Sequence, residues 1–195
     1  MSAQMSEKQA LERIMAALPR GAAAVVANGY ISREVYGVED RPGNFYMIGS
    51  MGLAGSIALG AALARPERPV VVLDGDGNVL MGLGALAVIG SSRPPNLWHI
   101  CLDNGVYAST GNQPTVAPQV RLEGIAREAG YRWSGRVDTL DELTRALPGF
   151  FAQEGPVFLR VMVGVQPHPR SFPRVSHTPL QMRDRFSAAL RGEVE

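Results

Sequence analysis

The hydrophobic pattern along the chain contains short apolar runs in which polar and apolar positions do not alternate. The run "PVVVLD" (69–74) is an example, with four consecutive apolar residues after its proline. Such runs are typical of strands that are covered on both faces. The predicted strands span residues 22–28, 45–49, 69–74, 96–104 and 156–163.

The segments between these runs predict helices. Residues 50–64 read "SMGLAGSIALGAALA", which is apolar on nearly every face and predicts a buried helix that ends before Pro66. Alternation of strands and helices predicts an α/β fold, a parallel sheet with helices on both faces. We expect one domain over residues 1–195, in which 165–195 form a C-terminal arm. Further helices are predicted over 5–18, 78–90, 121–130 and 139–151, with a short one beginning near Thr178-Pro179.

Composition and charge exclude several classes of function. The 195 residues carry a net charge of +1, so no basic excess favours nucleic acid. Cys101 is the single cysteine, which excludes an internal disulfide and a cysteine-cluster metal site. No apolar run reaches the roughly 18 residues of a membrane span, and the N-terminus lacks the features of a secretory signal. We therefore expect a cytoplasmic protein that binds neither nucleic acid nor membranes.

The segment "LDGDGNVL" (73–80) places an acid between two glycines at the end of a predicted strand. In parallel sheets, ligands bind beyond such strand ends, where helix N-termini attract anions. A P-loop and a dinucleotide fingerprint are excluded, because Asn78 and Leu80 stand where those motifs need a lysine and a glycine. Asp76 would repel a pyrophosphate unless a divalent cation lay between them. The segment therefore predicts Mg²⁺ held by Asp76 against a diphosphate.

A second ligand for this ion is predicted from the next strand. Asn104 ends the predicted strand 96–104, and Gly105 allows a sharp turn after it. The side-chain oxygen of Asn104 and the backbone carbonyl of Val106 would add two oxygen ligands to Asp76. Taken alone, Asp76 is equally typical of an acid that caps a helix. The combination of the two segments favours the metal.

At this point the sequence resembles a known family. "GDG" followed by a helix, a strand and an asparagine turn is similar to the diphosphate-and-magnesium motif of thiamine diphosphate enzymes. "FYMIGSMGLAGSIALGAAL" looks like the stretch that precedes GDG in that family. "LDNGVYASTGNQPT" and the tail "PRSFPRVSHTPLQMRDRF" resemble the phosphonopyruvate and sulfopyruvate decarboxylases. The resemblance covers roughly residues 7–190 and implies the diphosphate-binding fold of these enzymes.

The resemblance also implies roles for particular residues. Asp76 and Asn104 would bind Mg²⁺ through their side chains, and Val106 through its carbonyl. Met51 would be the apolar wedge under the thiamine, with Gly49 near the aminopyrimidine and Ser50 near the diphosphate. The remaining expected cofactor contacts are Gly75, Gly77, Asn78 and Tyr107. The chain departs from the family at Asn78, where serine is common, at Asp103, where a first asparagine is common, and at Gly111-Asn112, where some relatives have two glycines.

The activity that the resemblance implies is nonoxidative decarboxylation of a small anionic 2-oxo acid. Sulfopyruvate would give sulfoacetaldehyde, and phosphonopyruvate would give phosphonoacetaldehyde. In the family, a second domain supplies the glutamate that activates the cofactor, so we expect a partner subunit with the pyrimidine-binding domain and a hetero-oligomer. Two alternatives remain open: the β subunit of a 2-oxoacid oxidoreductase, and a non-catalytic subunit that only binds the cofactor.

Several other polar residues have ordinary structural interpretations. His99 and Cys101 lie within a predicted buried strand and are interpreted as core residues. Ser109 and Thr110 either line the active site or pack their loop. The arm carries His168, Arg170, Arg174 and His177. Arginine suits a sulfonate or phosphonate, although a basic tail is more typical of a solvated surface or a subunit contact.

Overall fold

A single large sheet determines where the other elements lie. The computed structural model describes residues 5–167 and 173–194, and its main sheet has six strands in the order β2-β1-β3-β4-β8-β7. All neighbouring strands are parallel, which confirms the predicted architecture. The strands are β1 (Ala23–Val26), β2 (Asn44–Tyr46), β3 (Val70–Gly75), β4 (Leu97–Asp103), β7 (Trp133–Val137) and β8 (Val157–Met162).

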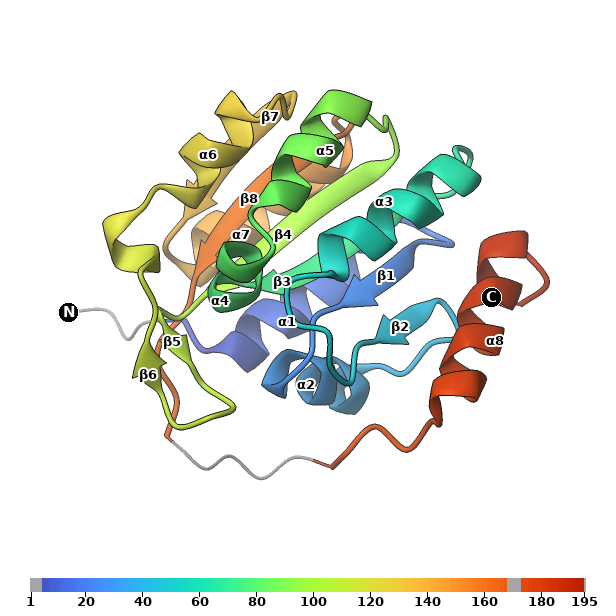
Figure 1. Ribbon diagram of the computed structural model, residues 1–195, viewed down its shortest axis with the longest axis horizontal. Helices are drawn as coiled ribbons and strands as arrows, with labels where there is room; N and C mark the ends of the chain where they lie inside the picture. The colour runs from blue at the N-terminus through green and yellow to red at the C-terminus, as the bar shows by residue number, and fades with distance from the viewer. Residues whose placement is uncertain (1–4, 168–172, 195) are drawn as a thin grey trace.

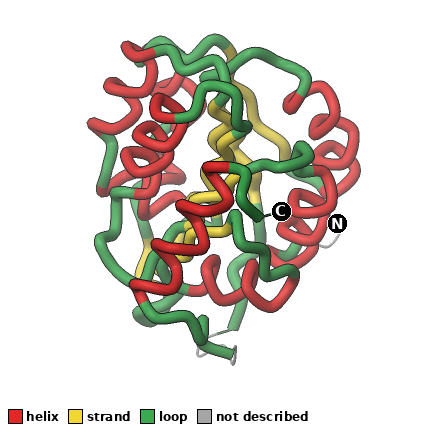
Figure 2. The backbone as a smooth tube through the Cα atoms, turned by 90° about the vertical axis from the view of Figure 1, so that its right-hand side faces the viewer, coloured by secondary structure: helices red, strands yellow, loops and turns green. Residues whose placement is uncertain are grey.

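Helices cover both faces of this sheet, as Figures 1 and 2 show. Val71 and Leu73 of β3 belong to one apolar cluster, and Val70 and Val72 belong to the other. The continuous apolar run therefore reflects a strand that is buried on both sides. One face carries α1 (Glu7–Ala17), α2 (Tyr30–Val38) and α7 (Leu140–Phe151), and the other carries α3 (Ala54–Ala64), α4 (Asp76–Met81), α5 (Gly84–Ser92) and α6 (Leu122–Glu128).

Two predicted helices differ from the structure by more than the one or two residues at which helix ends commonly vary. The helix predicted over 50–64 begins only at Ala54, because Ser50 and Gly52 adopt positive φ angles of 57° and 92° in the preceding turn. The prediction of one helix over 78–90 was wrong, since α4 and α5 are separate helices. Gly82 lies between them, directly against the backbone of Gly52, where any side chain would collide.

The structure also contains elements that the hydrophobic pattern does not predict. Helix α2 has only nine residues and follows Gly29 directly. In β7, at the edge of the sheet, only Ser134 and Val137 are buried, so the strand has no apolar run. A small antiparallel pair, β5 (Val106–Tyr107) and β6 (Gln113–Pro114), and a short 3₁₀ helix, η1 (Ala117–Gln119), follow β4.

The C-terminal helix α8 (Pro179–Arg191) lies beside the other edge of the sheet (Figure 1). Its N-terminus is capped by Thr178, as the Thr178-Pro179 pair predicts. Phe186 packs against Phe45 of β2, with ring centroids 5.3 Å apart, so α8 shields the edge strand. His168 and Arg170 lie outside the described residues. Within the described ranges, none of the helices has the length and apolar character of a membrane span.

Candidate cofactor-binding site

A cleft opens at the carboxyl ends of the central strands. Gly75 lies opposite Leu102 in the register of β3 and β4, so the residues that follow both strands emerge at the same edge. Ligands bind at this position in open parallel sheets. The cleft is lined by Glu7, by residues 27–31 after β1, by Met51, by Gly75, Asp76, Gly77 and Asn78, and by Leu102, Asn104, Val106, Tyr107, Ala108, Ser109 and Thr110.

Asp76 is the first residue of α4 and is only 2% exposed. Thr115 donates a hydrogen bond of 2.6 Å from its hydroxyl to Oδ2 of Asp76. Burial, reinforced by the nearby Asp103 carboxylate, raises the pKa of Asp76 to about 6, although the Thr115 hydroxyl and the backbone N–H groups of Gly77 and Asn104 lower it. Ionised Asp76 is therefore a buried anion that a cation would stabilise.

Asn104 and Val106 form the turn directly after β4. Oδ1 of Asn104 accepts a hydrogen bond of 2.9 Å from the backbone N–H of Val106, which fixes the turn in the geometry of an Asx turn. Both residues line the same cleft as Asp76. A carboxylate, an amide oxygen and a backbone carbonyl are oxygen ligands of the kind that Mg²⁺ takes from proteins, with phosphates and water completing the octahedron.

Glycines bring the backbone close to the centre of the cleft. A Cβ atom on Gly77 would lie 2.5 Å from Cε1 of the Tyr107 ring and 3.3 Å from Cε of Met51. A Cβ atom on Gly75 would lie 3.1 Å from Cδ1 of Ile31. Side chains at either position would therefore narrow the cleft, whereas glycine leaves room for a phosphate group beside the backbone. The donor set and this glycine cradle fit a magnesium diphosphate.

Asn78 connects the glycine segment to the turn that contains Met51. Oδ1 of Asn78 accepts a hydrogen bond of 2.6 Å from the backbone N–H of Gly52, and its Nδ2 donates to Oδ1 of Asp74. Oδ2 of Asp74 lies 3.2 Å from Nε2 of His99, whose Nδ1 lies 3.1 Å from the Tyr131 hydroxyl. His99 is thus a hydrogen-bonded core residue. The Asn78 amide is engaged within the protein, which leaves its backbone N–H for a diphosphate.

Replacing Asn78 with alanine is expected to loosen the Met51 turn. The substitution leaves the buried Asp74 carboxylate and the Gly52 N–H without these partners, which destabilises a folded protein by about 1–3 kcal/mol. Urea unfolding of the two proteins measures the difference. Thr144→Ala is the matched control, because it removes one exposed hydrogen bond of 2.7 Å to Leu140. Equal effects of Asn78→Ala and Thr144→Ala would contradict the role of Asn78.

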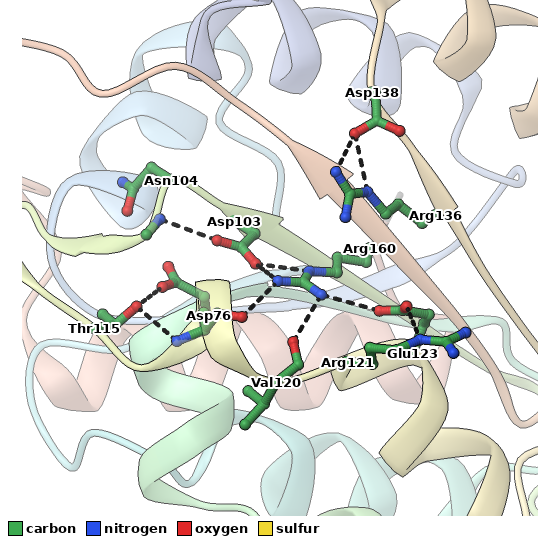
Figure 3. A network of polar contacts seen from close by, with 12 residues as sticks. Asp76, Asp103, Asn104, Thr115, Val120, Arg121, Glu123, Arg136, Asp138 and Arg160 are labelled. Atoms are coloured by element: carbon green, nitrogen blue, oxygen red, sulfur yellow. Dashed lines mark hydrogen bonds and ion pairs between the residues drawn. The ribbon is translucent and has the colours of Figure 1, made fainter.

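A second polar network holds the loop that follows Asn104 (Figure 3). The Arg160 side chain, 3% exposed, pairs with Asp103 at 2.6 Å and with Glu123 at 3.1 Å. It also donates to the backbone carbonyls of Ala117 and Val120 at 2.9 and 3.0 Å. This pairing explains why an acid is tolerated at position 103, since Arg160 neutralises it. The network fixes both ends of the loop that brings Thr115 to Asp76.

The structure brings most of the predicted site residues together at one cleft. Gly49 and Ser50 are exposed and do not line it, so their contacts with a cofactor stay predictions. The pattern missed Thr115, whose contact with Asp76 spans 39 positions in the chain. It also missed Asn28, whose Oδ1 is buried without a hydrogen-bond partner in the described structure. Its position at the end of a predicted parallel strand was the signal that could have found it.

Comparison with known proteins decides the family. Residues 28–161 match the family described as "Thiamine pyrophosphate enzyme, C-terminal TPP binding domain". The chain belongs to this family of thiamine diphosphate enzymes. The resemblance inferred from the GDG and asparagine segments is therefore confirmed. Structural comparison agrees with this assignment. The structure of a thiamine diphosphate-dependent 4-hydroxybenzoylformate decarboxylase from Rhodococcus jostii superposes on this chain with a TM-score of 0.74. That match has 26% identity and covers 85% of this chain and 34% of the other.

Two curated relatives differ in how much of their length this chain covers. Phosphonopyruvate decarboxylase from Streptomyces viridochromogenes is 46% identical over 182 residues, which cover 92% of this chain and 45% of that protein. The sulfopyruvate decarboxylase β subunit from Methanothermobacter thermautotrophicus is 41% identical over 188 residues, covering 96% of each chain. The chain thus spans less than half of the first relative and nearly all of the second.

Proposed function

We propose that this chain is the cofactor-binding subunit of a thiamine diphosphate- and Mg²⁺-dependent decarboxylase. Its substrate would be a small anionic 2-oxo acid, either sulfopyruvate or phosphonopyruvate. The proposal rests on one observation: Asp76, Asn104 and Val106 line the same cleft as Gly75 and Gly77. The names of the relatives, a phosphonopyruvate decarboxylase and a sulfopyruvate decarboxylase β subunit, support the substrate class.

The residues of this chain would bind and orient the cofactor. Asp76, Asn104 and the Val106 carbonyl would hold Mg²⁺. The backbone at Gly75 would lie against the diphosphate, and the backbone N–H groups of Gly77 and Asn78 would donate hydrogen bonds to it. Met51 and Tyr107 line the cleft beside Gly77 and would exclude water from the reacting centre. When bound, the cofactor supplies the electron sink that makes loss of CO₂ possible.

A partner subunit is part of the proposal. The segment around Gly52 touches the segment around Gly82, and the large apolar side chains beside these glycines are exposed. Ile48 is 70% exposed, Leu53 49% and Met81 61%. Apolar residues gathered next to a cofactor cleft favour a protein interface. We expect it to receive a pyrimidine-binding subunit that carries the activating glutamate, giving a cytoplasmic hetero-oligomer.

The oxidoreductase alternative is less well supported. Such chains usually work with an iron–sulfur cluster, and the single cysteine here, Cys101, is fully buried in β4. Burial, together with the carboxylates of Asp76 and Asp74, raises the pKa of its thiol, which disfavours thiolate ligation. An anaerobic assay with coenzyme A and an electron acceptor separates the two reactions.

Cofactor binding tests the proposal directly. Titration of the purified chain, and of its complex with a glutamate-bearing partner, with thiamine diphosphate is expected to give saturable binding that requires Mg²⁺. The assembled complex should then release CO₂ from sulfopyruvate or phosphonopyruvate. Binding that is unaffected by removal of divalent cations with a chelator would contradict the role given to Asp76 and Asn104. Binding without any turnover would favour a non-catalytic subunit.

A further inference from the structure

A second cavity adjoins the cofactor cleft on the side of α2. It has a volume of about 310 Å³. Asn28, Gly29 and Ser109 line both the cavity and the cleft, so the two are neighbouring compartments of one site. The cavity's own wall includes Arg33 from α2 and Arg174 from the segment before α8. No element of the cofactor proposal uses these two arginines.

Both arginines lack an acidic partner within the described residues. The Arg33 guanidinium lies over the Tyr30 ring, whose centroid is 5.7 Å from Cζ. Arg33 is partly buried and Arg174 is exposed, whereas the buried Arg160 is paired with Asp103. Two guanidinium groups at one cavity, without carboxylates opposite them in the described structure, give it a positive potential. A bound anion would therefore be stabilised there.

The start of α2, which carries Arg33, is hydrogen-bonded to the ends of two strands. The hydroxyl of Ser32, the preceding residue, donates to the carbonyl oxygens of Ala27 at 2.7 Å and Met47 at 3.2 Å. These carbonyls follow the ends of β1 and β2, so Ser32 ties the beginning of α2 to the edge of the sheet that forms the cleft. The backbone of Arg33 is therefore held next to the cofactor cleft.

The segment that carries Arg174 is attached to the same part of the molecule. The hydroxyl groups of Tyr36 and Ser176 are 2.7 Å apart, and Nε2 of His177 lies 2.9 Å from Oδ2 of Asp40. These contacts hold residues on both sides of the cavity together. Arg174 reaches the cavity from the C-terminal segment, while Arg33 reaches it from α2.

We propose that Arg33 and Arg174 bind the distal sulfonate or phosphonate group of the 2-oxo acid. This inference rests on the proposed function, because it assigns the 2-oxo carboxylate end to the cofactor cleft and the other end to the cavity. Guanidinium groups suit these anions, since each can donate two parallel hydrogen bonds to a pair of oxygens. Asn28, at the junction of the two compartments, would contact the middle of the substrate through its buried amide.

Substitution of each arginine in the assembled enzyme tests the inference. Arg33→Gln and Arg174→Gln are expected to lower kcat/KM for sulfopyruvate or phosphonopyruvate by roughly 10- to 100-fold each, mainly through KM, because each removes a charge-assisted contact. The ratio of kcat/KM for the anionic substrate to kcat/KM for pyruvate should fall by the same factor, since pyruvate has no distal anion. Arg33→Lys should restore part of the loss. Arg145→Gln is the matched control, an exposed arginine on α7.

Three outcomes would overturn the inference. The first is an unchanged preference for the anionic substrate in both glutamine variants. The second is loss of the complex in size-exclusion chromatography with an unaltered KM in what remains, which would make the arginines a subunit contact. The third is unaltered affinity of the magnesium-cofactor complex of each variant for sulfoacetate, an unreactive sulfonate, measured by calorimetry. The calorimetric result does not need turnover, so failure of the decarboxylase proposal and failure of this inference are distinguishable.

Discussion

Replacing Asp76 with asparagine is expected to abolish Mg²⁺-dependent cofactor binding while making the free chain more stable at pH 8. The carboxylate is the only charged protein ligand in the proposed metal site. Loss of an outer-shell partner weakens metal affinity by 10–100-fold, so loss of this ligand should exceed about 100-fold. Binding of thiamine diphosphate at fixed Mg²⁺ concentration measures the first effect.

The gain in stability follows from the pKa of Asp76. Burial raises this pKa from 3.8 to about 6 in the folded chain. Folding therefore favours the protonated acid, and the cost of ionising it appears as the pH rises from about 4 to 6. Above pH 6 the cost is complete, at about 3 kcal/mol. The asparagine variant does not have this cost. Below pH 4, the two chains should have similar free energies of unfolding.

Urea unfolding without metal at pH 5 and pH 8 checks this sign. The difference in free energy of unfolding between Asp76→Asn and the parent chain should be larger at pH 8. Added Mg²⁺ and thiamine diphosphate should stabilise only the parent. A variant that is less stable than the parent at pH 8 would show that the buried carboxylate is compensated without a metal, which contradicts the proposed site.

The strand-end residues of the site could be predicted because parallel strands order them at one edge. Asp76 and Asn104 follow two apolar runs, and the register of β3 and β4 places those strand ends level. Thr115 could not be predicted in the same way, because its loop has no periodic pattern. Its position depends on Arg160, which lies in another strand and reaches the loop through the carbonyls of Ala117 and Val120.

The elements that escaped prediction have related physical reasons. Helix α2 is short, and β7 lies at the edge of the sheet with a mixed surface, so neither leaves a strong hydrophobic signal. The break between α4 and α5 depends on the contact of Gly82 with Gly52, which only the folded chain creates. The second cavity could not be predicted for the same reason. Arg33 and Arg174 are far apart in sequence, and both line this cavity because the C-terminal segment is attached to α2.

Replacing Arg160 with methionine is expected to destabilise the fold by about 3–5 kcal/mol, the range found when one partner of a buried ion pair is removed. Asp103 is 1% exposed and would lose the guanidinium that pairs with it. The loop carbonyls of Ala117 and Val120 would also lose their donor. Since Asn104 follows Asp103 directly, affinity for the magnesium-cofactor complex should fall as well.

Two further variants separate the buried charge from the lost packing. The double variant Asp103→Asn, Arg160→Met should recover a large part of the stability lost in Arg160→Met, because it removes the uncompensated carboxylate. Arg136→Met is the control, since Arg136 and Asp138 form a pair with side chains 45% and 53% exposed, and exposed pairs contribute at most about 1 kcal/mol. If Arg160→Met costs no more than Arg136→Met in urea unfolding, then Asp103 is stabilised by something other than Arg160. Neutralisation by Arg160 would then not explain why an acid is tolerated at position 103.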